Sequence, residues 1–229
     1  MSETEWADAL LWLADVDSES VRAAIYDPPY AVGTPVRGKE DGAAGSVFSP
    51  LSFMSRTLRE VARTLMPGGV CLVFADWRRL PDLAYVCSTV GLRPATQVAW
   101  VRNRPGTGGL LRASWDPILV VARGVPDAID RAAIRNVVQA DYPFRRNHPY
   151  EKPVEVYRHI LQRVVRDGDL VIDPFAGSGN SRIAAESLGA KWRGCDIDPS
   201  WASSQECPPV MAHDSELDLF GVQDSEVSR

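Results

Sequence analysis

The chain has 229 residues, of which 45% are hydrophobic and 24% are charged, and its formal net charge is −5. This length accommodates one domain with a substantial buried core and a short appended segment. The apolar runs are far too short to cross a bilayer and the N-terminus is acidic, so we exclude a membrane span and a signal peptide and expect a cytoplasmic protein.

The distributions of charge and of cysteine narrow the functional classes further. Residues 78–146 contain 11 arginines and 5 aspartates, whereas residues 196–229 contain 8 acidic residues and one arginine. The basic middle is compatible with a surface that faces phosphate groups, and equally with an ordinary solvated surface. The four cysteines have no C-x-x-C spacing, so we expect reduced packing residues and no metal site.

The first elements alternate strand and helix. Residues 21–27 form a short apolar run that stops at Asp-Pro-Pro, which predicts a buried strand ending in a turn. Residues 33–50 show no periodicity, and an irregular stretch of this length is usually functional or disordered. Apolar residues at spacings of three and four over residues 51–65 predict a helix that ends at residues 67–69, and residues 70–75 predict the next strand.

The second half of the chain continues the alternation. We expect a helix over residues 80–90, a pair of strands at residues 96–101 and 118–122, and an amphipathic helix over residues 154–165. Residues 170–175 predict a buried strand, a glycine turn and a helix through Leu188 follow, and residues 192–197 predict the last strand. Together these elements favour an α/β layer architecture.

The glycine turn after the strand at residues 170–175 suits a nucleoside cofactor. It reads Asp173-Pro174-Phe175-Ala176-Gly177-Ser178-Gly179, and glycines there let a ligand approach the backbone just before a helix begins. Asp196 follows the next strand, where a carboxylate can accept hydrogen bonds from both hydroxyls of a ribose. A tight strand-to-helix turn beside a surface acid would give the same pattern without any ligand.

The strand end at Asp27-Pro28-Pro29-Tyr30 suggests a different chemistry. An exocyclic amino group on a nucleobase is a poor nucleophile because its lone pair is delocalised into the ring. The Asp27 carboxylate and the rigid Pro28 carbonyl can accept its two N–H groups, and Tyr30 offers a flat face to a base swung out of the duplex. A plain Pro-Pro turn at a strand end is the alternative reading.

With these motifs the chain resembles the amino-methyltransferase family of DNA-modifying enzymes, in the β class, where the catalytic motif precedes the cofactor motif. The resemblance spans residues 21–201 and includes His148-Pro149-Tyr150-Glu151-Lys152-Pro153, similar to an H-P-x-x-K-P element of the family. It implies a circularly permuted, Rossmann-like methyltransferase fold with a mostly parallel seven-stranded sheet. We place this domain at residues 1–205, followed by an acidic, flexible tail at residues 206–229.

The resemblance also implies a function and a set of site residues. It implies transfer of a methyl group from S-adenosylmethionine to a base of double-stranded DNA, with adenine N6 favoured because Asp at the first motif position is more usual for adenine. Cytosine-N4 methylation and a non-catalytic nucleic-acid-binding subunit are the alternatives. The residues implied to contact the cofactor are Asp27, His148, Lys152, Pro153, Asp173, Pro174, Phe175, Ala176, Gly177, Ser178, Gly179, Asn180 and Asp196.

The sequence departs from the family pattern at three places. Asn180 stands where the family commonly has Thr, which keeps a hydrogen-bonding side chain. Ser114-Trp115-Asp116-Pro117 replaces a His-Glu pair, so the role of that pair is in doubt here. Residues 1–20 lack the Gly-Asp strand that often opens such enzymes, so the third cofactor strand has no assigned position.

We expect short segments of the chain to recognise DNA. Residues 33–50 and 124–147 are the candidate DNA-contacting segments, and their brevity predicts a short recognition site, a homodimer or a partner, since each good base contact adds only about 1–3 kcal/mol of discrimination. Any one candidate arginine could equally be a plain surface residue. The candidate arginines are Arg102, Arg104, Arg112, Arg145 and Arg146.

The tail contains one further motif. Glu216-Leu217-Asp218-Leu219-Phe220 resembles the pentapeptide that binds the bacterial sliding clamp, with Glu in place of Gln. An extended segment with two apolar anchors suits capture by a groove on a partner. Packing of the same residues against the domain is the alternative. The motifs place the protein in a bacterial or phage-infected cell.

Overall fold

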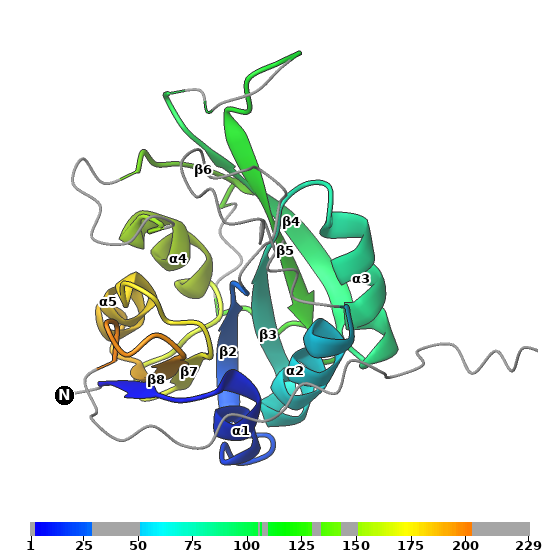
Figure 1. Cartoon of the computed structure of the whole chain (residues 1–229), viewed down its shortest axis with the longest axis vertical. Helices are drawn as coiled ribbons and strands as arrows, with labels where there is room; N and C mark the ends of the chain where they lie inside the picture. The colour runs from blue at the N-terminus through cyan, green and yellow to red at the C-terminus, as the bar shows by residue number, and fades with distance from the viewer. Residues whose placement is uncertain are drawn as a thin grey trace, which may run out of the picture.

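The computed structural model describes residues 3–28, 51–104, 106, 110–129, 134–142 and 151–202. These residues form one twisted α/β sheet with helices on both faces (Figure 1). No helix in these ranges is both long and apolar enough to cross a membrane. In chain order the elements are β1 (Thr4–Trp6), α1 (Ala9–Ala14), β2 (Val21–Tyr26), α2 (Leu51–Thr64), β3 (Leu65–Phe74), α3 (Leu80–Thr89), β4 (Arg93–Val101), β5 (Trp115–Ala122), β6 (Val137–Gln139), α4 (Val154–Leu161), β7 (Leu170–Asp173), α5 (Asn180–Glu186) and β8 (Lys191–Asp196).

The strand order is β1-β8-β7-β2-β3-β5-β4-β6, and only the β3–β5 and β4–β5 pairs are antiparallel. β2 lies at the point where the order reverses, because the chain leaves it toward β3 on one side and β7 pairs with it on the other. Ligands of open α/β sheets bind at the carboxyl ends of strands beside such a switch point. The ends of β2 and β7 are therefore the place to look for a site.

Two hydrophobic layers hold the helices to the sheet. One layer packs α1, α2 and α3 on one face, and the other packs α4 and α5 on the opposite face, as Figure 1 shows. All six residues of β2 are buried, which is why this strand is apolar on both faces apart from Arg22, whose guanidinium pairs with Asp127 and Asp169. Burial of β2 on both faces fixes the position of the residues that follow it.

The fold class expected from the sequence is confirmed, with eight strands in the sheet instead of seven. The two strands to which the sequence assigned no position, β1 and β6, are short: β1 pairs with β8, and β6 pairs with β4. β3 begins at Leu65, so the segment expected to end the preceding helix lies inside a strand. Gly69 permits this, because a Cβ there would lie 2.9 Å from the Met66 carbonyl oxygen and 3.0 Å from that of Val21.

The domain boundary at residue 205 remains a prediction. Residues 33–50 and 206–229, with the proposed tail motif Glu216 to Phe220, lie outside the described residues, as do residues 130–133 and 143–147 of the second candidate DNA segment. Three of the four cysteines fall in the described ranges, and each has a free, buried thiol, as expected.

Candidate active site

The carboxylate of Asp27 lies directly after β2, and its two oxygens have different surroundings. Its Oδ2 forms an ion pair with Lys152 Nζ, and the Asp27 side chain is 17% exposed. Its Oδ1 is buried and has no hydrogen-bond partner among the described residues. A buried acceptor without a donor is costly, so such an atom is expected where a ligand supplies the donor. Pro28 is buried beside it, whereas Pro29 and Tyr30 lie outside the described residues.

Asp173 ends the neighbouring strand β7 and is buried. Its Oδ1 accepts a hydrogen bond from the Phe175 backbone N–H at 3.0 Å, and its Oδ2 accepts one from Ser181 Oγ at 2.5 Å. Burial raises the pKa of Asp173 to about 7, against the lowering effect of these two hydrogen bonds, and the charges of Asp27 and Asp196 add to the rise. Carboxylates from β2, β7 and β8 thus converge on one edge of the sheet.

The glycine turn leaves open space next to these carboxylates. Gly177 and Gly179 have φ values of +46° and +75°, a region that favours glycine. The Gly177 N–H donates to Asp196 Oδ2 at 2.8 Å, and Asp196 Oδ1 accepts from the Asp198 N–H at 2.9 Å, so Asp196 fixes the turn against β8. A Cβ on Gly179 would meet no atom of the described residues within 4 Å. The turn and the acid fit a nucleoside ligand, since each carboxylate oxygen keeps a further lone pair.

The Lys152 segment is tied to the glycine turn through Asn180. The Asn180 side-chain amide donates to Glu151 Oε1 at 3.0 Å and to the Lys152 carbonyl oxygen at 2.8 Å. Lys152 Nζ also lies 5.1 Å from the centroid of the Phe74 ring at the end of β3. Pro153 caps the N-terminus of α4. The structure thus brings together Asp27, Lys152 and Asn180 as expected, while His148 lies outside the described residues.

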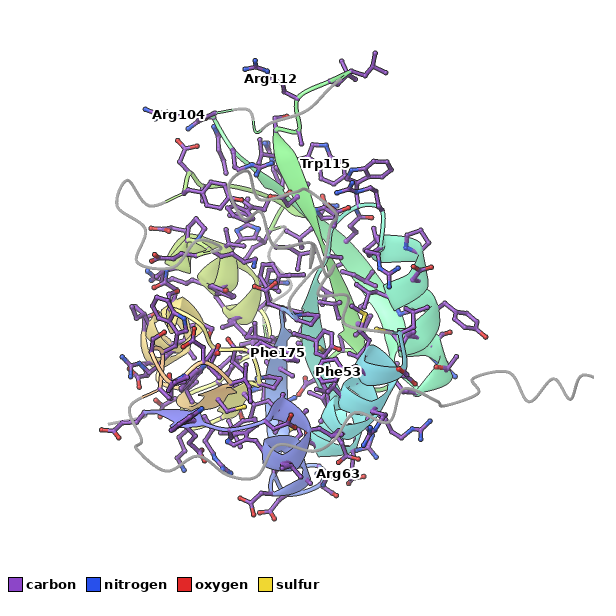
Figure 2. All side chains as sticks on the ribbon, viewed as in Figure 1. Phe53, Arg63, Arg104, Arg112, Trp115 and Phe175 are labelled. Carbon is purple, nitrogen blue, oxygen red and sulfur yellow. The ribbon has the colours of Figure 1, made fainter. Side chains whose placement is uncertain are left out.

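Aromatic rings surround Phe175 at the carboxyl ends of the strands. Phe175 makes an edge-to-face contact with Tyr26 at a centroid distance of 5.4 Å and a tilted contact with Phe53 at 6.2 Å. Figure 2 shows Phe53 and Phe175 near the centre of the molecule. Sequence reasoning did not single out Phe53, although an apolar residue off the main apolar face of a helix was an available signal.

The candidate arginines differ in their placement. Arg102 has a side chain only 9% exposed; it pairs with Asp116 Oδ2 at 3.0 Å and donates to Tyr142 Oη at 3.1 Å. Its guanidinium is thus occupied within the fold rather than presented to a phosphate. Arg104 and Arg112 are exposed at the β4–β5 connection (Figure 2), and Arg145 and Arg146 lie outside the described residues.

Asp116, which lies where the family has a His-Glu pair, is an acid to which the sequence assigns no role. Burial raises its pKa, while the positive charges of Arg102 and Lys152 oppose the rise. Lys152 therefore acts electrostatically on acids at two strand ends, those of Asp27 and Asp116.

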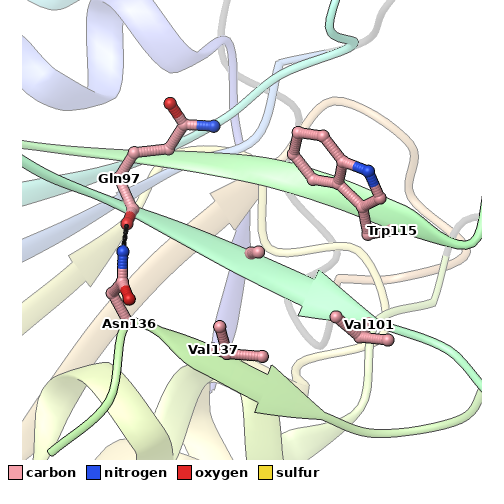
Figure 3. Close-up of a pocket in the computed structure, with 6 residues that line it drawn as sticks. Gln97, Val101, Trp115, Asn136 and Val137 are labelled. Atoms are coloured by element: carbon pink, nitrogen blue, oxygen red, sulfur yellow. Dashed lines mark hydrogen bonds between the residues drawn. The ribbon is translucent and has the colours of Figure 1, made fainter.

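A separate pocket of about 330 Å³ lies on the sheet face near β6 (Figure 3). Trp115 and Val137 are nearly half exposed there, and Asn136 Nδ2 donates to the Gln97 carbonyl oxygen at 3.0 Å across it. Its lining contains none of the residues expected to bind the cofactor or the amino group. We therefore place the site on the acids and the glycine turn rather than in this pocket.

The raised pKa of Asp173 predicts a pH-dependent stability. In the unfolded chain the carboxyl ionises near pH 3.8, whereas the folded protein retains the proton up to about pH 7. The folded state then binds more protons between these values, so this contribution to stability falls as pH rises through the interval and is constant above it. Asp173→Asn removes the titration while keeping one acceptor for the Phe175 N–H.

We therefore expect Asp173→Asn to gain stability relative to the wild type by up to about 3 kcal/mol when pH is raised from about 5 to about 8. Urea unfolding of both proteins at the two pH values measures this difference, in which the titrations of all other groups cancel. A stability difference that does not change with pH would contradict the assignment.

Comparison with known proteins supports the family suggested by the motifs. The family model described as DNA methylase, N6_N4_Mtase, matches residues 21–205. The curated DNA adenine methyltransferase YhdJ of Escherichia coli (strain K12) is 24% identical over 231 residues, which cover 85% of this chain and 78% of YhdJ.

Two solved structures confirm the fold. The M1.HpyAVI–SAM complex is 20% identical with a TM-score of 0.66, covering 88% of this chain and 96% of that one. The PvuII DNA methyltransferase, described as cytosine-N4-specific, is 17% identical with a TM-score of 0.71, covering 87% and 85%. Because the family model spans most of the sequence, the chain belongs to the N6/N4 DNA methylase family.

Proposed function

We propose that this DNA methylase modifies the N6 amino group of adenine, with Asp27 as the acceptor that prepares that amino group for attack. The observation that best supports the proposal is the buried, unpartnered Oδ1 of Asp27 at the switch point of the sheet. A carboxylate oxygen in this state can accept an N–H hydrogen bond without first losing another partner. The neighbouring glycine turn places room for a cofactor beside it.

Asp27 and Pro28 act on the amino nitrogen through hydrogen bonds. Acceptance of one N–H by Asp27 Oδ1 and of the other by the Pro28 carbonyl oxygen returns electron density from the ring to nitrogen. These acceptors are fixed before the reaction, because β2 is buried and the proline restricts its own backbone. Pro29 and Tyr30 retain their proposed roles from the resemblance, Tyr30 as the face on which the flipped base stacks.

The residues around the glycine turn fit S-adenosylmethionine, which supplies an activated methyl group on its sulfonium. Asp196 accepts the ribose hydroxyls, and the turn at residues 177–179 admits the ligand close to the backbone. Phe175, packed against Tyr26, gives this part of the site an apolar wall. Asp173 orients the turn through the Phe175 N–H, and Pro174, Ala176, Ser178 and Asn180 complete the proposed lining.

Adenine is favoured over cytosine by Asp27 at the first position of the motif and by the likeness to a DNA adenine methyltransferase over 85% of the chain. The fold itself does not discriminate, because the PvuII enzyme, which is cytosine-specific by its description, shares it. Mass spectrometry of nucleosides from treated DNA measures the product directly. We expect N6-methyladenine; N4-methylcytosine would reassign the base, and no methylated base would refute the proposal.

Contact with double-stranded DNA is proposed to involve the exposed Arg104 and Arg112 and, beyond the described residues, Arg145 and Arg146. Removing a phosphate contact weakens binding on all sequences and reduces its salt dependence. A homodimer, clamp binding through the tail and a cytoplasmic location remain predictions.

A further inference from the structure

We propose that Lys152 is a positioning residue for methyl transfer: it holds Asp27 by Oδ2 so that Oδ1 alone is presented to the amino group. This inference rests on the proposed function and assigns to Lys152 an action on the acceptor, in addition to its expected place beside the cofactor. The ion pair between Lys152 and Asp27 joins residues 125 positions apart in the sequence.

The surroundings of the pair make its geometry restrictive. The side chains of Lys152 and Asp27 are only 12% and 17% exposed. The Lys152 ammonium also lies 5.1 Å from the Phe74 ring centroid, and Phe74 packs against Tyr157 at 5.3 Å. Screening by water is weak at such a position, so the attraction between the two charges is strong and directional. Rotation of the Asp27 carboxylate would break this contact.

The two oxygens of Asp27 are consequently unequal. Oδ2 has the ammonium as its partner, while Oδ1 is shielded from solvent and has no partner in the part of the chain that the structure describes. Without Lys152 the carboxylate could turn either oxygen toward the amino group or away from it. Its charge would also face Asp173 at the end of β7 without compensation, since Asp27 acts on that acid electrostatically. Lys152 therefore fixes both the orientation and the charge of the acceptor.

Lys152 is itself held from the cofactor side of the site. Asn180 donates to the Lys152 carbonyl oxygen at 2.8 Å and to the side chain of the preceding Glu151 at 3.0 Å. Asn180 begins α5 directly after the glycine turn. The backbone of Lys152 is thus hydrogen-bonded to the residue that follows the glycine turn, and its side chain is ion-paired with Asp27. This one residue therefore aligns the acceptor with the proposed cofactor site.

The test is the substitution Lys152→Met, which keeps the length of the side chain and removes its charge. We expect kcat for DNA methylation to fall by about 100-fold, as when a preorganised electrostatic group is removed, with cofactor Kd within about threefold of the wild type. Lys152→Arg, which keeps the charge, should recover kcat to within about tenfold. Lys191→Met, at an exposed position on β8, is the matched control and should leave kcat and Kd unchanged.

Unchanged kcat in Lys152→Met would overturn the proposal, and so would a loss confined to cofactor Kd, which would assign Lys152 to binding alone. The Asp27→Asn background guards against misfolding, because there the Lys152→Met change leaves no unpaired buried carboxylate. Adding Lys152→Met to Asp27→Asn should not lower the single-turnover rate further, and a further loss would contradict action through Asp27. If Asp27→Ala itself retained turnover, the proposed function would fail instead.

Discussion

Replacing Asp27 with alanine is expected to lower kcat for DNA methylation by about 1,000-fold or more. The substitution removes the acceptor that draws electron density onto the amino nitrogen, and losses of this size follow removal of one preorganised electrostatic group together with its positioning effect. Cofactor affinity should change little, because the glycine turn is fixed by Asp196 and Asp173 rather than by Asp27. Isothermal titration and single-turnover assays separate the two effects.

Asp27→Asn is the informative companion, because it keeps the shape of the side chain and one acceptor oxygen but loses the charge. Its kcat should lie between those of the wild type and Asp27→Ala. Asp15→Ala is a suitable control, since the Asp15 side chain is 84% exposed and belongs to the end of α1. Normal turnover in Asp27→Ala would refute the catalytic assignment, whatever its effect on stability.

Replacing Gly179 with alanine is expected to weaken cofactor binding by about tenfold or more while the protein stays folded. Within the described ranges the added Cβ would meet no atom within 4 Å, so it would project into the space that we assign to the cofactor. The positive φ of +75° adds backbone strain of about 1 kcal/mol. Isothermal titration measures the affinity, and thermal unfolding measures the strain.

Gly91 provides an unusually close control for this change. It has a φ of +85° after α3, and a Cβ there would also meet nothing within 4 Å. Gly91→Ala should therefore reproduce the strain without the loss of affinity. Equal cofactor affinity in the two variants would mean that the open space at Gly179 is not the cofactor site.

The parts of the fold that were predictable share a strong local signal. The apolar face over residues 51–65 corresponds to α2, which ends at Thr64, and the paired strands at 96–101 and 118–122 correspond to β4 and β5. β2 was recognisable because burial on both faces makes it apolar at nearly every position, Arg22 excepted. In each case the pattern of apolar and polar residues along the segment reflects which of its faces are buried.

The elements that escaped prediction lack such a signal. β1 has three residues and is defined by its pairing with β8, whose partner residues lie about 190 positions away. β6 is equally short and exists through its pairing with β4. The early start of β3 depends on a shift of register against β2, which a stretch of Pro and Gly does not reveal.

For the candidate site, too, some features could be predicted from the sequence and others could not. A role for Asp27, Asp173 and Asp196 could be proposed because each lies at the carboxyl end of a strand or directly after it. The sequence could not predict which atoms form contacts, because the hydrogen bond of Asn180 to the Lys152 carbonyl and the ion pair of Arg102 with Asp116 depend on tertiary packing. Sequence alone therefore proposed the residues of the site, whereas the unequal oxygens of Asp27 required the structure.

The central claim is that the acceptor at β2 and the glycine turn after β7 form one site. A crystal structure of the protein with S-adenosylhomocysteine, the product of methyl transfer from the cofactor, tests this most directly. We expect that its ribose hydroxyls contact Asp196, that its backbone-facing edge lies at residues 177–179, and that its sulfur faces the side of Asp27 that presents Oδ1. Density for the ligand in the pocket beside β6, or with its sulfur directed away from Asp27, would contradict the claim.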